Sequence, residues 1–432
     1  MTKYDKILEW LYSQLPMYQR MGKAAYKADL DNTLKLDEYF GHPHEQFRSI
    51  HVAGTNGKGS VAHLLASVLQ SAGYKTGLYT SPHLIDFRER IRINGAMMPK
   101  KELISWVERH KNFFEALQPS FFEMTVALAF DYFASQEVEI AVVEVGMGGR
   151  LDSTNILIPE VSVITGIAKD HTEFLGNTLV SIAKEKAGII KDGIPVVIGE
   201  KRPEIIDVFE EFAGRLKAPL YLANQYFQVP YSVLANDGKQ YFNVRRGKRT
   251  VFPELYSDLE GIVQRKNLPV VLETLEVMKH NKWTIPDEAV YAGIANAKKL
   301  TGLKGRWDIV EHKPNLVFDT AHNEEGIKNL LKQLDETKYN KLHLVLGMVS
   351  DKNIDKVLQL LPRAACYYFT QAGIPRALDS KILAAKAGYY GLNGSIVSSV
   401  PLALEKAKEE AEEDDLILVT GSTYIVADAV GE

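Results

Sequence analysis

The feature that most constrains the fold is the segment 49–70, SIHVAGTNGKGSVAHLLASVLQ. A short apolar run leads into a glycine-rich loop, and a helical pattern follows it. The helical stripe consists of Val61, Leu64, Leu65, Val68 and Leu69. Strand, loop and helix in this order are the setting of a phosphate-binding loop, but the usual loop has its hydroxyl residue directly after the lysine. Here Gly59 stands between Lys58 and Ser60.

Further apolar runs follow the same plan. The segments are RSIHVAG, KTGLYTS, EIAVVEVG, EVSVITGI and IPVVIGE, apolar runs with β-branched residues that end in glycine-rich or polar turns. Such runs suit strands buried on both faces of a parallel sheet. Short alternating stretches over 221–251, with a turn at Asn236-Asp237-Gly238, predict hairpins. A helical region is expected over 264–299.

A second series of strand patterns begins near Thr301 with NLVFDTAHN, KLHLVLGMVSDKN, ACYYFTQAG and DDLILVTGSTY. The pattern predicts an α/β protein with a phosphate-loop domain over 1–300 and a smaller Rossmann-like α/β domain over 301–432. LTGLKGRW is the expected linker. Ligands of such sheets bind outside the carboxyl ends of the strands, so the residues at those ends are the candidates for function.

Composition narrows the class of partner. The formal net charge is −4, which offers no basic field for nucleic acid. Cys366 is the single cysteine, so neither a disulfide framework nor a cysteine-based metal site is expected, and cytosol is the natural compartment. No apolar stretch reaches the length of a membrane span. We therefore expect a cytoplasmic protein that binds small molecules rather than nucleic acid or membrane.

The glycines of the loop predict its chemistry. Gly54, Gly57 and Gly59 let the backbone approach phosphate oxygens, and the helix that follows adds its positive end. Lys58 supplies a charge for the outer phosphates, and the Ser60 hydroxyl can reach Mg²⁺. The alternative, a plain glycine-rich turn, explains neither the strand before the loop nor the helical stripe after it.

Other candidates have weaker signals. Glu144 ends an apolar strand in VVEVGMGGRLDSTN, where it could bind Mg²⁺ or pair with Arg150. His171 in AKDHTEFLG could be a metal ligand, although a lone histidine is more often simply hydrogen-bonded. In SIAKEKAGIIK nothing in the spacing distinguishes Lys186 from an ordinary solvated lysine. Arg306, Asp319 and His322 stand at the start of the second domain, where Asp319 ends a strand. His322 and Asn323 begin the next helix, and taken alone they are better explained as a helix cap.

Together these segments resemble the folylpolyglutamate and dihydrofolate synthases of the Mur ligase superfamily. The resemblance runs from about residue 20 to the end. It rests on HVAGTNGKGS, YTSPHLIDFRERIRING, EVGMGGRLDSTN, DHTEFLG, AKEKAGIIK, GRW, DTAHN and VTGS in this order. The loop with the additional glycine is the form that this superfamily carries.

The resemblance implies a role for each matching position. The ATP phosphates would be held by Thr55, Asn56, Gly57, Lys58, Gly59 and Ser60, and further nucleotide contacts would come from Asn267, Arg306 and Asp319. One or two Mg²⁺ ions would be bound by Ser60, Ser81, Glu144 and His171. The catalytic set would be Lys58, Lys186, His171 and His322, with Lys186 carrying a CO₂-derived carbamate. A pterin and benzoate pocket would be lined by Ser120, Phe121, Phe122, Glu123, Leu151, Asp152 and Ser153.

Three positions depart from the family pattern. Glu324 stands where proline usually follows AHN, RLDSTN replaces the more common RLDATN, and the segment around Tyr26 and Lys27 is unlike the usual forms. The implied reaction uses ATP to convert a substrate carboxylate into an acyl phosphate, which the amine of L-glutamate then attacks. Closure of the two domains would bring Arg306 and Asp319 onto ATP and exclude water.

Substrate choice remains open at this level. We expect a bifunctional dihydrofolate synthase/folylpolyglutamate synthase that acts as a monomer. The alternatives are a folylpolyglutamate synthase only, and a Mur-type amino-acid ligase lacking the UDP-binding domain. Only 53 residues precede Gly54, which is short for such a domain. A GTPase is disfavoured, because no N-K-x-D-like guanine motif is present.

Overall fold

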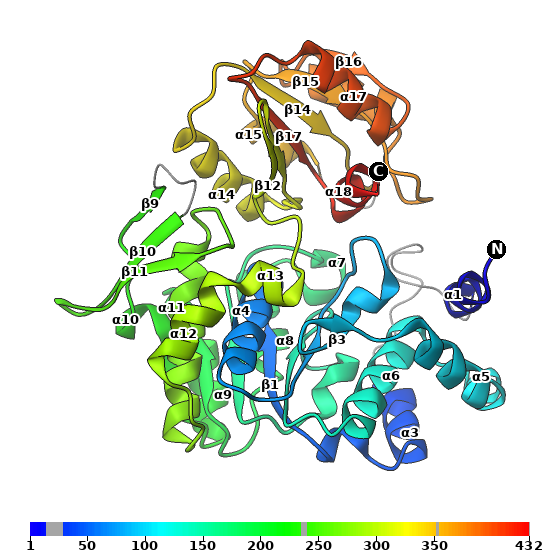
Figure 1. Ribbon diagram of the computed structural model, residues 1–432, viewed down its shortest axis with the longest axis vertical. Helices are drawn as coiled ribbons and strands as arrows, with labels where there is room; N and C mark the ends of the chain where they lie inside the picture. The colour runs from blue at the N-terminus through cyan, green and yellow to red at the C-terminus, as the bar shows by residue number, and fades with distance from the viewer. Residues whose placement is uncertain (14–28, 235–239, 351–353, 432) are drawn as a thin grey trace. The chain divides into compact units, whose positions relative to one another are not determined.

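A computed structural model describes residues 1–13, 29–234, 240–350 and 354–431 (Figure 1). Tyr26, Lys27 and the predicted turn at Asn236-Asp237-Gly238 lie outside these residues. The described chain divides into two compact units. The first contains 1–13, 29–258 without 235–239, and 263–303, and the second contains 259–262 and 304–431 without 351–353.

The first unit is built on an eight-stranded sheet of order β4-β3-β2-β5-β1-β6-β7-β8. Its strands are β1 Arg48–Ala53, β2 Thr76–Tyr79, β3 Ile91–Ile93, β4 Ala96–Met97, β5 Ile140–Glu144, β6 Val161–Ile164, β7 Val196–Ile198 and β8 Leu220–Leu222. All pairs from β2 to β8 are parallel, whereas β3 and β4 pair antiparallel at one edge. The five strands predicted from apolar runs are confirmed. The short edge strands β3, β4 and β8 were not predicted.

Helices cover this sheet on both faces. They are α1 Lys3–Ser13, α3 Asp31–Tyr39, α4 Lys58–Ser71, α5 Lys100–Leu117, α6 Phe121–Ser135, α7 Thr172–Leu175, α8 Leu179–Ala187, α9 Ile206–Arg215, α10 Ala223–Tyr226, α11 Gln264–His280, α12 Asp287–Ala295 and α13 Ala297–Thr301. The described residues also form the 3₁₀ turns η2 Pro43–Glu45, η3 Phe87–Arg90 and η4 Ser153–Ile156. α4 lies between the sheet and α11–α13 and is buried nearly all round, so it presents a fixed N-terminus at the end of β1.

The predicted hairpins form a separate antiparallel sheet of order β11-β10-β9. The prediction is wrong for the start of its range, because residues 221–226 are the end of β8 and the helix α10. Its strands are β9 Ser232–Leu234, β10 Gln240–Arg246 and β11 Arg249–Ser257. The helical region predicted after it corresponds to α11, α12 and α13. None of the helices in the described parts of the chain is long and apolar enough to cross a bilayer.

The second unit has a six-stranded sheet of order β12-β13-β17-β14-β15-β16. The strands are β12 Asp308–His312, β13 Asn315–Phe318, β14 Leu342–Leu346, β15 Cys366–Phe369, β16 Gly394–Ile396 and β17 Leu416–Thr420. Its helices are α14 Glu324–Asp335, α15 Asp355–Leu360, α16 Ser380–Gly388, α17 Val400–Glu410 and α18 Thr423–Val430. The four predicted strands are β13, β14, β15 and β17. The edge strands β12 and β16 are largely exposed and lack the apolar runs used for prediction.

Candidate functional site

The phosphate loop requires glycine at two positions. Gly54 follows β1 with φ 150°, and a Cβ there would lie 1.8 Å from the Oγ1 atom of Thr165. Gly57 precedes α4 with φ 92°, and its Cβ would lie 2.6 Å from the Oδ1 atom of Asn267. Both positions combine a left-handed backbone with a close neighbour, so a side chain would force the loop to move. Asn267, predicted to touch the nucleotide, therefore lies directly against the loop.

The loop is held in shape by the segment after β6. The amide of Thr55 donates to the carbonyl of Gly166 at 2.7 Å, and its hydroxyl bonds both the amide and the carbonyl of Ala168. The Thr165 hydroxyl donates to the carbonyl of Asn56 at 2.8 Å. Gly59 and Ser60 are buried in the first turn of α4. These contacts keep the start of α4 and its free amides in a fixed position, as an anion site requires.

A carboxylate from β5 lies beside the loop lysine. The Nζ atom of Lys58 is 4.0 Å from Oε1 of Glu144, which is 5% exposed. The amide of Ser81 donates to the other oxygen of Glu144 at 3.3 Å. Arg150, the alternative partner of Glu144, instead pairs with Glu185 at 3.0 Å. The structure thus brings together Lys58, Glu144 and Ser81, three residues predicted to act on phosphates and metal.

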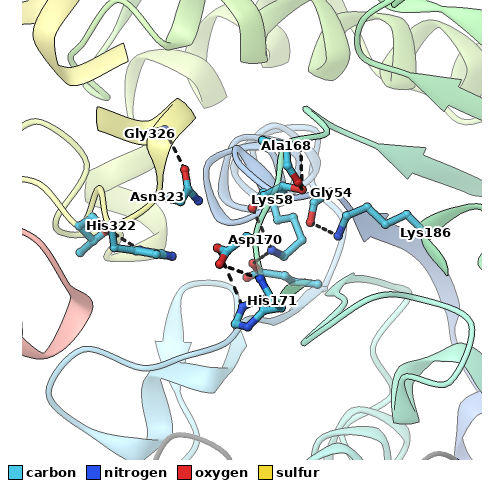
Figure 2. Close-up of polar contacts among 12 residues, drawn as sticks. Gly54, Lys58, Ala168, Asp170, His171, Lys186, His322, Asn323 and Gly326 are labelled. Carbon is cyan, nitrogen blue, oxygen red and sulfur yellow. Dashed lines mark hydrogen bonds and ion pairs between the residues drawn. The ribbon is translucent and has the colours of Figure 1, made fainter. Parts of the chain in front are cut away.

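Lys186 in α8 is buried and reaches the loop. Its Nζ atom donates to the carbonyl oxygen of Gly54 at 2.7 Å (Figure 2). Burial and then the charge of Lys58 lower the pKa of Lys186 to about 7. At neutral pH, Lys186 is therefore the neutral amine in a substantial fraction of the molecules. The neutral amine is the form that can attack CO₂. Sequence spacing could not reveal this, because the helix pattern does not show that this face is buried against the loop.

His171 is the residue before α7 and has a left-handed backbone with φ 48°. The carboxylate of Asp170 accepts a hydrogen bond from the backbone amide of His171 at 2.9 Å (Figure 2). The same carboxylate lies 4.0 Å from the ring atom Nε2 of His171. The side chain is partly exposed, at 30%. The alternative of a hydrogen-bonded histidine describes these contacts, and a place for His171 in the metal site stays a prediction.

The predicted substrate pocket divides into two groups. Ser120 and Glu123 form a reciprocal capping box at the start of α6, with the Ser120 amide 2.5 Å from Oε2 of Glu123. Phe121 belongs to the apolar core. Phe122 instead lies against Gly146, where a Cβ would come within 2.4 Å of its ring. Phe122 is thus the member of SFFE that reaches the loop after β5.

The second group lies in and after that loop. Ser153 is buried and Leu151 half-buried. Asp152 is buried and accepts from the amides of Met147 and Thr154 and from the Thr154 hydroxyl, the last at 2.5 Å. Burial raises the pKa of Asp152, and these donors oppose that rise.

A buried hydrogen-bond chain that the sequence did not predict holds Asp152 in place. Nε2 of His51 in β1 lies 2.8 Å from the Thr154 hydroxyl. Burial lowers the pKa of His51 to about 3, so its ring is neutral at pH 7. Since Thr154 donates to Asp152, we assign the ring proton to Nε2, which then donates to Thr154. A histidine inside an otherwise apolar strand was the available signal.

In the second unit, two predicted segments are joined. The carboxylate of Asp319, after β13, accepts the amides of Trp307 and Ala321, both at 2.8 Å. Arg306 bonds the Thr320 hydroxyl and the carbonyl of Gly305. Burial raises the pKa of Asp319, and the two amides and Arg306 lower it. The segments GRW (305–307) and DTAHN (319–323) are therefore hydrogen-bonded to each other. Together they form a corner at the carboxyl end of β13.

The residues after that corner begin α14. Nδ1 of His322 lies 2.9 Å from the Thr320 carbonyl, which fixes a proton on that nitrogen. Asn323 is the helix cap, accepting the Gly326 amide at 2.8 Å (Figure 2). The helix-cap alternative thus applies to Asn323, while the roles predicted for His322 and Asp319 remain predictions.

Comparisons with known proteins agree with this arrangement. The Mur ligase middle domain matches residues 52–212, and the Mur ligase glutamate ligase domain matches 305–423. A dihydrofolate synthase/folylpolyglutamate synthase from Bacillus subtilis is 33% identical over 437 residues, covering 99% of this chain and 98% of the relative.

Solved structures give the same result. A Mycobacterium tuberculosis folylpolyglutamate synthase complexed with ADP has a TM-score of 0.89 and 29% identity, covering 99% of this chain and 98% of that one. A bifunctional folylpolyglutamate synthase/dihydrofolate synthase from Yersinia pestis, complexed with AMPPNP and Mn ion, has a TM-score of 0.82 and 28% identity, with coverage of 98% and 97%. The chain belongs to the dihydrofolate synthase/folylpolyglutamate synthase family of Mur ligases.

Proposed function

We propose that this chain joins L-glutamate to dihydropteroate and to reduced folates, using ATP and passing through an acyl phosphate. As a member of its family it is an ATP-dependent acid–amino-acid ligase. The observation that carries the proposal is the phosphate loop itself, with Lys58 beside Glu144 and the Lys186 nitrogen 2.7 Å from Gly54. These groups suit a reaction whose main need is the management of negative charge.

Different residues of the chain would act on the phosphates and on the metal ion. The amides at the start of α4 and Lys58 would neutralise the phosphoryl group while the substrate carboxylate attacks it. Glu144, Ser60 and Ser81 offer oxygen atoms, the donors that Mg²⁺ prefers. A bound Mg²⁺ would screen the phosphate charge. Related proteins have been solved with ADP, and with AMPPNP and Mn ion, which supports ATP and a divalent metal here.

We also propose that Lys186 carries a carbamate. Its neutral Nζ would attack the carbon of CO₂ and lose a proton to solvent, which converts the neutral amine into an anion with two oxygen donors. Supporting this, Lys186 is 3% exposed and the pKa of its amine is lowered to about 7. An ammonium would repel both Lys58 and a nearby metal ion.

We propose that the folate is contacted by Phe122, Leu151, Asp152 and Ser153. We also propose that ATP is contacted by Asn267, Arg306, Asp319 and His322. The test is ADP formation with each substrate omitted in turn. A ligase needs the folate acceptor and glutamate together, whereas a GTPase-like protein would release phosphate without either. A monomeric state and a cytosolic location stay predictions from the sequence.

A further inference from the structure

Three potential metal ligands converge outside the candidate site. Nδ1 of His42 lies 2.7 Å from Oδ2 of Asp37, and Nδ1 of His44 lies 2.6 Å from its Oδ1. The three residues each offer one ligand atom, and these atoms all lie within 4.8 Å of one another. The Asp37 side chain is 5% exposed and that of His44 13%, while His42 is half exposed at 52%. A partly open pocket of two imidazoles and one carboxylate results.

This cluster is separate from the phosphate loop. Asp37 lies in the last turns of α3, His44 lies in η2, and both precede β1 in the chain. The phosphate loop follows β1 at its other end. β1 has six residues, so the length of a strand, roughly 20 Å at about 3.3 Å per residue, separates the two places. The cluster therefore requires an explanation of its own.

The backbone preorganises the three ligands. His42 has φ 56°, in the left-handed region, and its amide donates to the carbonyl of Asp37 at 2.9 Å. Pro43 then starts η2 and is buried. This tight reversal places His42 and His44 on either side of one carboxylate. Glu38 and Glu45 add negative charge near His42, which favours a cation at this place.

We propose that Asp37, His42 and His44 bind a divalent transition-metal ion of the Zn²⁺ class. Two imidazole nitrogens and a carboxylate are donors that Zn²⁺ accepts, at bonds of about 2.0–2.2 Å. In a tetrahedral site the donors stand about 3.3 Å apart, so each imidazole nitrogen would move outward by roughly 0.6 to 0.7 Å from its present contact with Asp37. Each neutral ring would give up its Nδ1 proton and take up one at Nε2, with no net proton released, so that Nδ1 is free to bind the ion and Nε2 carries the hydrogen.

The remaining coordination positions would hold water, because the protein supplies three ligands. The ion would tie the end of α3 to η2, the two elements that precede β1 and pack on α6. Mg²⁺ would compete poorly, since it prefers oxygen ligands and octahedral geometry. The competing account is a carboxylate that merely accepts two hydrogen bonds from imidazoles, in which case no ion is needed.

The test is Zn²⁺ titration of the untagged, chelator-treated protein in excess Mg²⁺, with Co²⁺ absorption as a second probe. We expect one tightly bound Zn²⁺ per chain, a Co²⁺ spectrum of low coordination number, and a higher Tm with Zn²⁺. His42→Ala and His44→Ala should each weaken binding at least about tenfold. His42 is exposed enough that its loss should leave the fold intact, and circular dichroism checks this.

Two matched variants locate the ion. His280→Ala removes an exposed histidine elsewhere, and His171→Ala removes the histidine predicted for the Mg²⁺ site. Both should bind Zn²⁺ as the wild type does. Wild-type binding by the double variant His42→Ala/His44→Ala would overturn the proposal, as would the absence of a stoichiometric site in the wild-type protein.

Discussion

The Nζ atom of Lys186 lies 2.7 Å from the carbonyl oxygen of Gly54, so a helix lysine and the first glycine of the phosphate loop are in direct contact. This contact ties α8 to the end of β1 across a buried interior. It places an amine of lowered pKa beside the loop that would hold the ATP phosphates. If the amine takes up CO₂, one N–H remains on the carbamate nitrogen to donate to this carbonyl, and the two new oxygens become acceptors beside the loop.

Lys186→Arg tests the carbamate. Arginine keeps the positive charge but cannot take up CO₂ in this way, so kcat should fall on the order of a hundredfold or more. Lys184→Arg, an exposed change on the same helix, is the control and should be neutral. Removing CO₂ from the buffer should slow the wild type, and bicarbonate should restore it. Full activity of Lys186→Arg would refute the carbamate.

The same lysine predicts a pH effect on stability. Its pKa is near 7 when folded and near the ordinary 10.5 when unfolded, so between these values the unfolded chain binds more protons. The free energy of unfolding should therefore rise with pH from about 7 towards 10, by at most about 1.4 kcal/mol per pH unit. Denaturant unfolding in CO₂-free buffer measures this. Lys186→Met should have a smaller slope, and equal slopes would contradict the burial of an uncharged amine.

Lys58→Ala should abolish turnover with little change in Tm, because it removes charge stabilisation and no core volume. Ser60→Ala should weaken the use of Mg²⁺-ATP. Lys101→Ala, an exposed change on α5, is the matched control. ADP formation measures the turnover of each variant, and a thermal melt measures its Tm. Near-wild-type turnover in Lys58→Ala would be incompatible with the phosphate-loop role.

Thr154→Val tests the support behind Asp152. It removes the hydroxyl that donates to Asp152 and accepts from His51, leaving buried polar atoms unsatisfied. We expect kcat/KM for the folate acceptor to fall roughly 5- to 100-fold, with the KM for ATP unchanged. Thr154→Ser keeps the hydroxyl and should restore most of the activity. An equal loss towards ATP and folate would indicate general damage instead.

Asp319→Ala tests the second unit. It frees the amides of Trp307 and Ala321 and should raise the KM for ATP or lower kcat by about tenfold. Arg306→Ala should act in the same direction. Asp335→Ala at the end of α14 is the control for surface charge. If Asp319→Ala has unchanged kinetics and a normal melting curve, the corner formed by GRW and DTAHN is not part of the nucleotide site.

Sequence patterns predict the parts of this fold that are buried on both sides. The runs around Ile50, Val142 and Val163 are mostly apolar and are buried, because parallel strands lie between helix layers. Short edge strands such as β4 carry too few residues for a pattern. Likewise, glycine spacing predicts the phosphate loop, whereas the contacts of Lys186 and His51 depend on which distant segments meet. Such contacts cannot be derived from periodicity along the chain.

The most direct test of the proposed function is glutamate-dependent ADP formation, measured with dihydropteroate and with tetrahydrofolate as separate acceptors. We predict ADP release with each acceptor, stoichiometric with the amide formed and absent when glutamate is omitted. Activity on tetrahydrofolate alone would restrict the chain to folylpolyglutamate synthesis and contradict bifunctionality. No glutamate-dependent ADP with either acceptor, from a folded protein that binds ATP, would contradict the folate assignment itself.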